Sequence, residues 1–240
     1  MNLCLVTGAN SEIGTSIVKF LLKKNYKVIA CIHKNDDSIK KINDDNLIIK
    51  KVDLCNELEI QELLKNVKLD LIVNAAAYYF DDELKNLKKE DIMKTLEVNV
   101  VAPLLISKYA NMDKGKVINI SSLDGIDTFN EINIPYSISK AGLNILTKNL
   151  AYAVKNVQFY ALALGWVDTK MIHEIDEYYL KSEMKRCNQN YLISLNEIND
   201  YIDRILNDEF KNGEIIKVDG KNEYWCASTR KWKRIEINFW

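Results

Sequence analysis

The residues best suited to do chemistry are Tyr136 and Lys140, four positions apart, with Ser122 and Gly125 a short way upstream. On a helix, residues four apart lie on the same face, so the phenol and the ammonium group point into the same space. A free tyrosine has a pKa near ~10, and a nearby positive charge favours its ionised form by roughly 1–3 units. Such a tyrosine can exchange a proton with an alcohol or carbonyl oxygen, which a serine hydroxyl can hold. Taken alone, a tyrosine and a lysine at this spacing are far more often solvated side chains on a helix surface.

The size and charge of the chain limit what surrounds this pair. The chain has 240 residues, which suits one large α/β domain, and 48% of them are hydrophobic, enough to form a sizeable core. A formal net charge of -1 gives no electrostatic reason to expect a nucleic-acid or membrane partner.

The start of the chain and its cysteines indicate a cellular location. Met1 is followed by an apolar run and a glycine turn, without the basic segment of a signal peptide, and no apolar run reaches the ~18 residues of a membrane span. The five cysteines are scattered and never in Cys-x-x-Cys spacing. We therefore expect a cytoplasmic protein with reduced thiols, and the two distant histidines add to the expectation of no metal site.

Apolar, strand-like runs alternate with helical patterns along most of the chain. Alternation of this kind predicts βαβ units, a doubly wound parallel sheet of about seven strands, and a single α/β domain over residues 1–220. The expected strands cover residues 3–6, 27–32, 47–52, 69–74, 116–121, 157–164 and 214–218, and the expected helices cover 13–24, 57–66, 88–110, 136–155 and 196–207.

A glycine-marked turn over residues 7–14 follows the first strand and opens the first helix. In such a turn, backbone N–H groups and the helix N-terminus can face a pyrophosphate. The spacing differs from Gly-x-Gly-x-x-Gly, so an ordinary βα turn is the alternative. The turn residues that we expect to bind a dinucleotide are Gly8, Asn10, Ser11, Glu12, Ile13 and Gly14.

The end of the second strand bears on which dinucleotide binds. NAD sites place an acidic residue there, whereas NADP sites use basic ones. Here His33 and Lys34 follow the strand, and the acidic Asp36 and Asp37 come later in the loop. This order favours NADP over NAD, although a solvated loop lysine would look the same.

Other candidate contacts follow the later strands. Asp53 and Leu54 follow the third strand, where an acid can contact adenine or cap the next helix. The small residues after the fourth strand leave room for a cofactor or form a tight loop. The segment after the sixth strand can reach a nicotinamide carboxamide. The residues concerned in these last two segments are Asn74, Ala75 and Ala76, and Gly165, Val167 and Thr169.

Asn99 lies inside an otherwise apolar helical pattern, where a buried amide needs a partner. It can hold a water molecule or accommodate a kink, and a surface asparagine is the alternative. All the other features fall at strand ends or on the helices beside them, where open parallel sheets bind ligands.

In this ordered set of motifs, the chain resembles the short-chain dehydrogenase/reductase family. The resemblance implies a Rossmann-type fold and a catalytic tetrad at Asn99, Ser122, Tyr136 and Lys140. The matching segments are residues 7–14, 73–76, 164–169 and 213–220. Four family positions differ here, with Glu12, Ala76 and Lys221 in place of glycine and Leu164 in place of proline. Glu12 suits a helix N-terminus but can oppose the 2′-phosphate of NADP.

The resemblance also implies roles for the tetrad. Tyr136 is the general acid and base, and Lys140 lowers its pKa and holds the nicotinamide ribose. Ser122, rather than Ser121, polarises the substrate oxygen, and Asn99 supports a water that links Lys140 to solvent. The implied activity is NADP(H)-dependent transfer of a hydride to or from a carbonyl or secondary alcohol, with a 3-oxoacyl-carrier-protein-reductase-like role first.

Several alternatives and two segments remain open. Tyr78, Tyr79 and Phe80 suggest a pteridine-directed reductase, a sugar-directed one is another option, and a non-catalytic nucleotide-binding regulator is a third. The family's use of its fourth and fifth helices implies a homodimer or homotetramer. Residues 171–194 lie where relatives carry a substrate lid. Residues 221–240 form an extension, with a strand-like pattern at 235–239, that we expect to pack on the body or on a partner subunit.

Overall fold

The computed structural model describes residues 1–33, 37–129, 131–221, 223–226 and 231–234. A seven-stranded sheet lies at its centre, and every neighbouring pair of its strands is parallel. The strands are β1 (Leu3–Thr7), β2 (Lys27–Ile32), β3 (Leu47–Lys51), β4 (Leu71–Asn74), β5 (Gly115–Ser122), β6 (Val157–Leu164) and β7 (Ile215–Val218). This confirms the predicted fold, with strand ends within two residues of those expected.

The order of the strands places a reversal at the first one. The sheet runs β3-β2-β1-β4-β5-β6-β7, so the chain moves outward from β1 to β3 and then crosses back to pair β4 with the other side of β1. The carboxyl ends of β1 and β4 therefore form a topological switch point, where parallel sheets bind their ligands.

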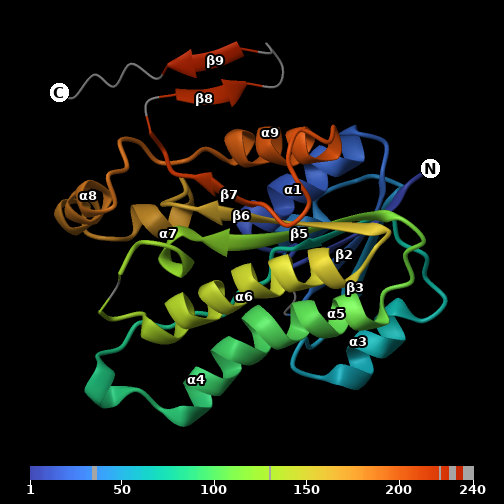
Figure 1. Ribbon diagram of the computed structural model, residues 1–240, viewed down its shortest axis with the longest axis horizontal. Helices are drawn as coiled ribbons and strands as arrows, with labels where there is room; N and C mark the ends of the chain where they lie inside the picture. The colour runs from blue at the N-terminus through green and yellow to red at the C-terminus, as the bar shows by residue number, and fades with distance from the viewer. Residues whose placement is uncertain (34–36, 130, 222, 227–230, 235–240) are drawn as a thin grey trace.

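Helices cover both faces of the sheet (Figure 1). On one face, α1 (Glu12–Lys23) and α9 (Leu195–Leu206) pack side by side, and their buried side chains join one apolar cluster with strand residues. On the other, α3 (Glu57–Leu64), α5 (Ala102–Tyr109) and α6 (Ile134–Ala153) contribute to a second cluster. Strands β1, β4 and β6 are buried on both faces, as their continuous apolar runs require.

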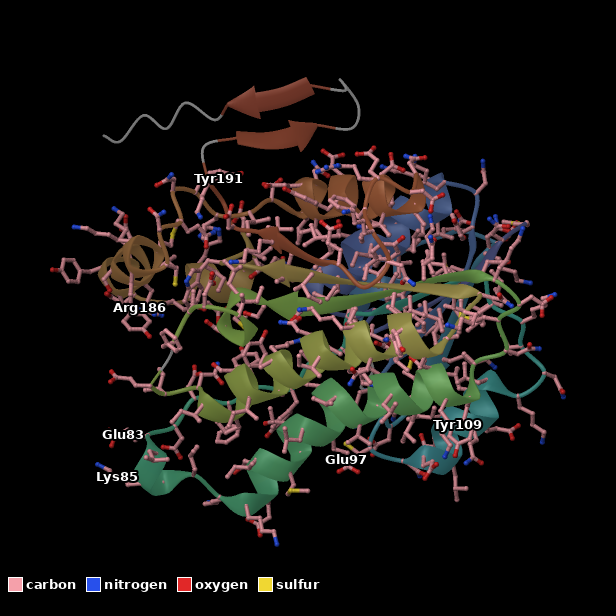
Figure 2. The ribbon with its side chains drawn as sticks, viewed as in Figure 1. Glu83, Lys85, Glu97, Tyr109, Arg186 and Tyr191 are labelled. Atoms are coloured by element: carbon pink, nitrogen blue, oxygen red, sulfur yellow. The ribbon has the colours of Figure 1, made fainter. Side chains whose placement is uncertain are left out.

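The predicted helix over residues 88–110 is interrupted. It consists of α4 (Lys89–Leu96), a π-helical segment η2 (Glu97–Val101) and α5. In this segment Glu97 is exposed (Figure 2), whereas the Asn99 side chain is only 1% exposed. The interruption thus turns the asparagine toward the interior, and π-helical turns of this kind are frequent at functional sites.

The structure also has shorter elements, of which only a pair of surface helices within residues 171–194 was expected from the sequence. They are α2 (Asp37–Lys40), η1 (Leu84–Asn86), η3 (Leu123–Gly125), α7 (Lys170–His173), α8 (Glu177–Arg186) and the antiparallel hairpin of β8 (Glu223–Cys226) and β9 (Lys231–Arg234). The hairpin lies beyond α9, with β8 nearer to it (Figure 1). The strand pattern expected at 235–239 lies outside the described residues.

Candidate active site

The glycine turn after β1 packs directly against the segment that follows β4. Gly8 has a φ of +62°, and a Cβ at this position would lie 2.6 Å from the Ala76 Cα. The Ala76 N–H donates to the Thr7 hydroxyl at 3.2 Å. A Cβ at Gly14 would lie 2.2 Å from the Gly8 carbonyl oxygen. Side chains at these two glycines would force the switch point open, so the sequence needs glycine at both.

The start of α1 presents free hydrogen-bond donors. Ser11 is the N-cap, and its Oγ accepts from the Gly14 N–H and donates to the Gly8 carbonyl, both at 2.9 Å. Among the described residues, the N–H groups of Glu12 and Ile13 have no acceptor. Unpaired donors at a helix N-terminus suit an anionic group. The turn therefore fits the pyrophosphate of a dinucleotide.

Tyr136 and Lys140 lie one turn apart near the start of α6. The Tyr136 hydroxyl forms a hydrogen bond with Ser122, the last residue of β5. The Lys140 side chain is 2% exposed, and its Nζ lies 5.3 Å from the centre of the Tyr136 ring. The ammonium group donates to the Ile120 carbonyl of β5 at 2.8 Å. The structure thus brings the predicted serine, tyrosine and lysine together at the end of β5.

Burial sets the protonation of this group. It raises the pKa of Tyr136, with a smaller contribution from the Asp124 carboxylate, while the hydrogen bond with Ser122 acts in the opposite direction. Burial also lowers the pKa of Lys140 to about 8. The expectation of a lowered pKa for Tyr136 is therefore not met in the ligand-free protein, because loss of hydration on burial raises it.

The two serines at the end of β5 face different partners. The Ser121 hydroxyl donates to the Lys140 backbone carbonyl at 3.4 Å and is buried behind the helix. Ser122 faces Tyr136, and its Oγ accepts from the Asp124 N–H at 3.2 Å. The preference for Ser122 as the substrate-facing hydroxyl agrees with this geometry. A Cβ at Gly125 would lie 2.5 Å from the Lys140 backbone, so this glycine lets the serine segment approach the helix.

Asn99 connects three parts of the site through its side-chain amide. Its Oδ1 accepts from the Tyr78 N–H at 2.8 Å, and its Nδ2 donates to the Tyr78 carbonyl at 2.9 Å and to the Ser139 hydroxyl at 2.9 Å. Ser139 directly precedes Lys140 on α6. The amide therefore ties the segment after β4 to the helix that carries the tyrosine and lysine.

The residues expected near adenosine follow the carboxyl ends of β2 and β3. His33 is exposed directly after β2, and Lys34 lies outside the described residues. Asp53 accepts through Oδ1 from the Cys55 N–H at 2.9 Å, and the N-cap of α3 is Asn56. The helix-cap alternative for Asp53 is therefore wrong. Its neighbour Leu54 packs against the apolar cluster on that face.

The loop after β6 is held by a residue that the sequence did not reveal. Gln189 is 4% exposed, and its amide accepts from the Trp166 N–H and donates to the Trp166 carbonyl, both at 2.8 Å. A Cβ at Gly165 would lie 2.5 Å from the Gln189 Oε1. Val167 is buried and bridges Ile193. The loop that ends at Thr169, the N-cap of α7, is thus fixed in place.

Tyr79, one residue of the aromatic run that follows β4, packs against Tyr136. Its ring meets the Tyr136 ring edge-on, with centroids 6.3 Å apart and an interplanar angle of 76°. Its hydroxyl contacts the sulfur of Met171 on α7. The segment expected to form a lid therefore begins, at Met171, beside the ring that packs on Tyr136, and it continues into α8, whose last residue is Arg186 (Figure 2).

Two further searches bear on the class of site. No group of three or more potential ligands is placed to hold a metal within the described part of the chain. Of the helices built from described residues, none is long and apolar enough to cross a membrane.

Comparisons with known proteins agree with this geometry. A family model described as short chain dehydrogenase matches residues 2–179. A 3-oxoacyl-acyl-carrier-protein reductase from Rickettsia prowazekii (strain Madrid E) is 32% identical over 184 residues, which cover 72% of this chain and 76% of the relative.

Solved structures are similar over nearly the whole chain. A 4-hydroxyisoleucine dehydrogenase complexed with NADH is 25% identical with a TM-score of 0.81, and the match covers 92% of this chain and 98% of the other. A 2-deoxy-D-gluconate 3-dehydrogenase from Agrobacterium tumefaciens with bound NADP, so described provisionally, is 22% identical with a TM-score of 0.80 and is similar in fold, over 91% of this chain and 95% of the other.

Proposed function

The chain belongs to the short-chain dehydrogenase family, and from that premise we propose that it is an NADP(H)-dependent oxidoreductase acting on a carbonyl or a secondary alcohol. The observation that carries this proposal is the hydrogen-bonded pair of Tyr136 and Ser122 with the buried ammonium of Lys140 beside it. Two hydroxyl groups side by side are suited to bind one substrate oxygen.

Each of these side chains has a part in the proposed reaction. A bound nicotinamide supplies the hydride in reduction and accepts it in oxidation. Ser122 holds the substrate oxygen, and Tyr136 donates a proton to that oxygen during reduction or removes one during oxidation. The raised pKa of Tyr136 keeps its proton available at neutral pH. Lys140 supplies positive charge near the phenol and is within reach of a ribose in the cleft.

The pyrophosphate of the cofactor is assigned to the glycine turn. The unpaired N–H groups of Glu12 and Ile13 are its proposed donors, and the close packing of Gly8 on Ala76 leaves backbone rather than side chains at the switch point. The preference for NADP rests on His33 and Lys34 after β2, in the absence of an acidic residue at the end of that strand.

For the substrate, we favour a 3-oxoacyl thioester because the relative from Rickettsia is a 3-oxoacyl-acyl-carrier-protein reductase. Tyr79, edge-on to Tyr136, is the specific feature that favours a second candidate, a flat cyclic carbonyl compound such as a pteridine. Sugars are a further option. All of these substrates would use the hydroxyl groups of Ser122 and Tyr136. They differ in the size and polarity of the part that residues 171–194 would enclose.

We also propose a homodimer or homotetramer. Exposed apolar side chains lie on the helices that cover one face of the sheet. They are Met93 on α4, Val101 at the end of η2, Leu104 on α5, and Ile138, Ile145 and Tyr152 on α6. These side chains are between 41% and 85% exposed, an unusual number for helices that need no partner. The extension after residue 220 is proposed to pack on the body, which the approach of β8 to α9 supports.

Binding and turnover experiments test the proposal separately. Titration with NADPH and NADH, followed by cofactor fluorescence, is expected to give the lower Kd for NADPH. Oxidation of NADPH is then measured with acetoacetyl thioester, cyclic ketones and keto sugars. Binding without turnover on every substrate would instead favour a nucleotide-binding regulator, and tighter binding of NADH would overturn the NADP preference.

A further inference from the structure

Glu12 forms a hydrogen bond across the mouth of the proposed cofactor cleft. Its Oε2 accepts from the backbone N–H of Lys170 at 2.7 Å, joining residues 158 positions apart. Glu12 is the first residue of α1, and Lys170 is the first residue of α7. One side chain thus connects the glycine turn after β1 to the segment after β6, the two segments assigned to opposite parts of the cofactor.

The position of this carboxylate is the important point. Glu12 begins the helix whose free N–H groups, at Glu12 and Ile13, are the proposed donors to a pyrophosphate. A helix N-terminus attracts negative charge, so the carboxylate is stabilised there while no other anion is present. Among the described residues, Glu12 takes part in no ion pair that would neutralise it. Its charge is therefore available to act on an incoming anion.

We propose that Glu12 acts as an internal competitor of the cofactor. In the ligand-free protein, its carboxylate occupies the positive end of α1 and holds the Lys170 amide. A dinucleotide brings a second anion to the same helix end, and the two negative charges repel each other. Either the carboxylate gives up its hydrogen bond with the Lys170 N–H, or it stays in place and repels the pyrophosphate. In both cases Glu12 lowers the affinity for the pyrophosphate. This inference rests on the proposed function.

Two substitutions separate the charge from the bridging contact. Glu12→Gln keeps the length of the side chain and an acceptor oxygen but removes the charge. Glu12→Asp keeps the charge but is one methylene shorter, so it cannot span the same gap. Glu62→Gln is the matched control, because Glu62 is exposed on α3 and forms an ion pair with the neighbouring exposed Lys65. It changes the net charge of the protein by the same amount.

The experiment measures the Kd of ADP-ribose and of NADPH by isothermal titration calorimetry at low and high salt. We expect Glu12→Gln to bind both roughly fivefold more tightly than the unchanged protein, as about 1 kcal/mol of partly screened charge repulsion would give. The gain should shrink at high salt, where exposed charges are screened. Glu12→Asp should stay close to the unchanged protein, and Glu62→Gln should not change affinity.

The outcomes distinguish this inference from the proposed function. If the unchanged protein binds ADP-ribose and Glu12→Gln binds it no more tightly, Glu12 does not compete with the cofactor. The proposed function is unaffected by that result. If Glu12→Gln and Glu12→Asp both weaken binding, the side chain clamps the cofactor and the inference is overturned. If neither the unchanged protein nor any variant binds a ligand, both the inference and the proposed function fail.

Discussion

The side-chain amide of Gln189 pairs with the backbone of Trp166 in the way that a neighbouring strand would. It accepts from the Trp166 N–H and donates to the Trp166 carbonyl, both at 2.8 Å, and also donates to the Tyr191 carbonyl at 2.7 Å. Tyr191 lies between α8 and the sheet edge (Figure 2). One amide therefore fixes the loop after β6 to the segment that follows the lid helix.

This pairing predicts a coupling between Gln189 and Gly165. A Cβ at Gly165 would lie 2.5 Å from the Gln189 Oε1, so Gly165→Ala displaces the amide. Gln189→Ala removes the partner of the Trp166 N–H and of the Tyr191 carbonyl, at a cost of about 1–3 kcal/mol for each group left unpaired, whereas the Trp166 carbonyl keeps the Ile193 N–H. We expect the double variant to be more stable than the sum of the two single effects predicts. With alanine at position 189, the new Cβ at position 165 no longer collides with an amide oxygen. Urea unfolding of the three variants measures this, with Gln61→Ala on α3 as control.

Additive effects would show that the loop moves away from Gln189 without cost. The KM for cofactor provides a second readout, since a loop that only stabilises the fold would leave it unchanged. We expect the KM to rise in Gln189→Ala, because the loop ends at Thr169 in the proposed nicotinamide site.

The catalytic assignment predicts that Tyr136→Phe loses turnover and keeps cofactor binding. General acid–base groups contribute roughly 10²- to 10⁴-fold to rate, so we expect kcat to fall by at least ~100-fold. The phenol is hydrogen-bonded to Ser122 and not to the glycine turn, which is why the Kd for NADPH should remain nearly unchanged. Stopped-flow and fluorescence titration measure the two quantities. Tyr152→Phe, at a position that is 85% exposed, should alter neither.

Burial of Lys140 predicts how reduction depends on pH. Its pKa is lowered to about 8, so the ammonium charge is complete below that pH and lost above it. We expect kcat/KM for carbonyl reduction to fall as pH rises through about 8, because this ratio reports groups of the free enzyme. Lys140→Arg keeps its charge throughout and should remove the decline from whatever activity it retains. A ratio that stays constant across this range would contradict the assignment.

The three hydrogen bonds of the Asn99 side chain predict that its removal lowers the free energy of unfolding considerably. Asn99→Ala removes the partners of the part-buried Tyr78 N–H and carbonyl and one of the two partners of the Ser139 hydroxyl, which still donates to the Tyr136 carbonyl. We expect a loss of about 2–4 kcal/mol in the free energy of unfolding. Asn86→Ala removes an exposed side-chain hydrogen bond to Asp82 and should cost less than about 0.5 kcal/mol. Equal losses in chemical denaturation would mean that η2 is not held by Asn99.

Local patterns in the sequence were sufficient for the sheet and for the grouping of the catalytic residues. Buried strands need continuous apolar runs, and the glycines at 8 and 14 lie where backbone segments touch, so both features leave a local signal. The spacing of Tyr136 and Lys140 is a property of one helix, and the position of Asn99 among valines indicated a buried amide, although not the π-helical turn around it.

Long-range contacts left no such signal. Gln189 meets Trp166 across 23 positions and Glu12 meets Lys170 across 158, and neither pair belongs to a repeating pattern. The pKa of Tyr136 was predicted in the wrong direction for the ligand-free protein, because the sequence shows that a lysine is near but not how deeply both groups are buried. Burial is a property of the whole fold, so local spacing cannot supply it.

A buried carboxyl group on α9 predicts a pH-dependent stability that is independent of catalysis. Glu197 is 3% exposed and accepts from the Tyr191 hydroxyl at 3.0 Å. Burial raises its pKa to about 7 from 4.5. A carboxyl group with a raised folded-state pKa contributes stability that is complete below the unfolded value and is lost as the pH rises through about 7.

Glu197→Gln should therefore be more stable than the unchanged protein above pH 7, by about 1–3 kcal/mol, and the difference should shrink toward pH 4.5. The amide keeps an oxygen for the Tyr191 hydroxyl and carries no charge, so the penalty of a buried carboxylate disappears. Urea unfolding across this range measures the difference between the two proteins, which cancels the other titrating groups. Glu90→Gln, at an exposed position on α4, should show no such trend. If Glu197→Gln were less stable at every pH, the carboxylate would be stabilised by its surroundings, and the raised pKa would be wrong.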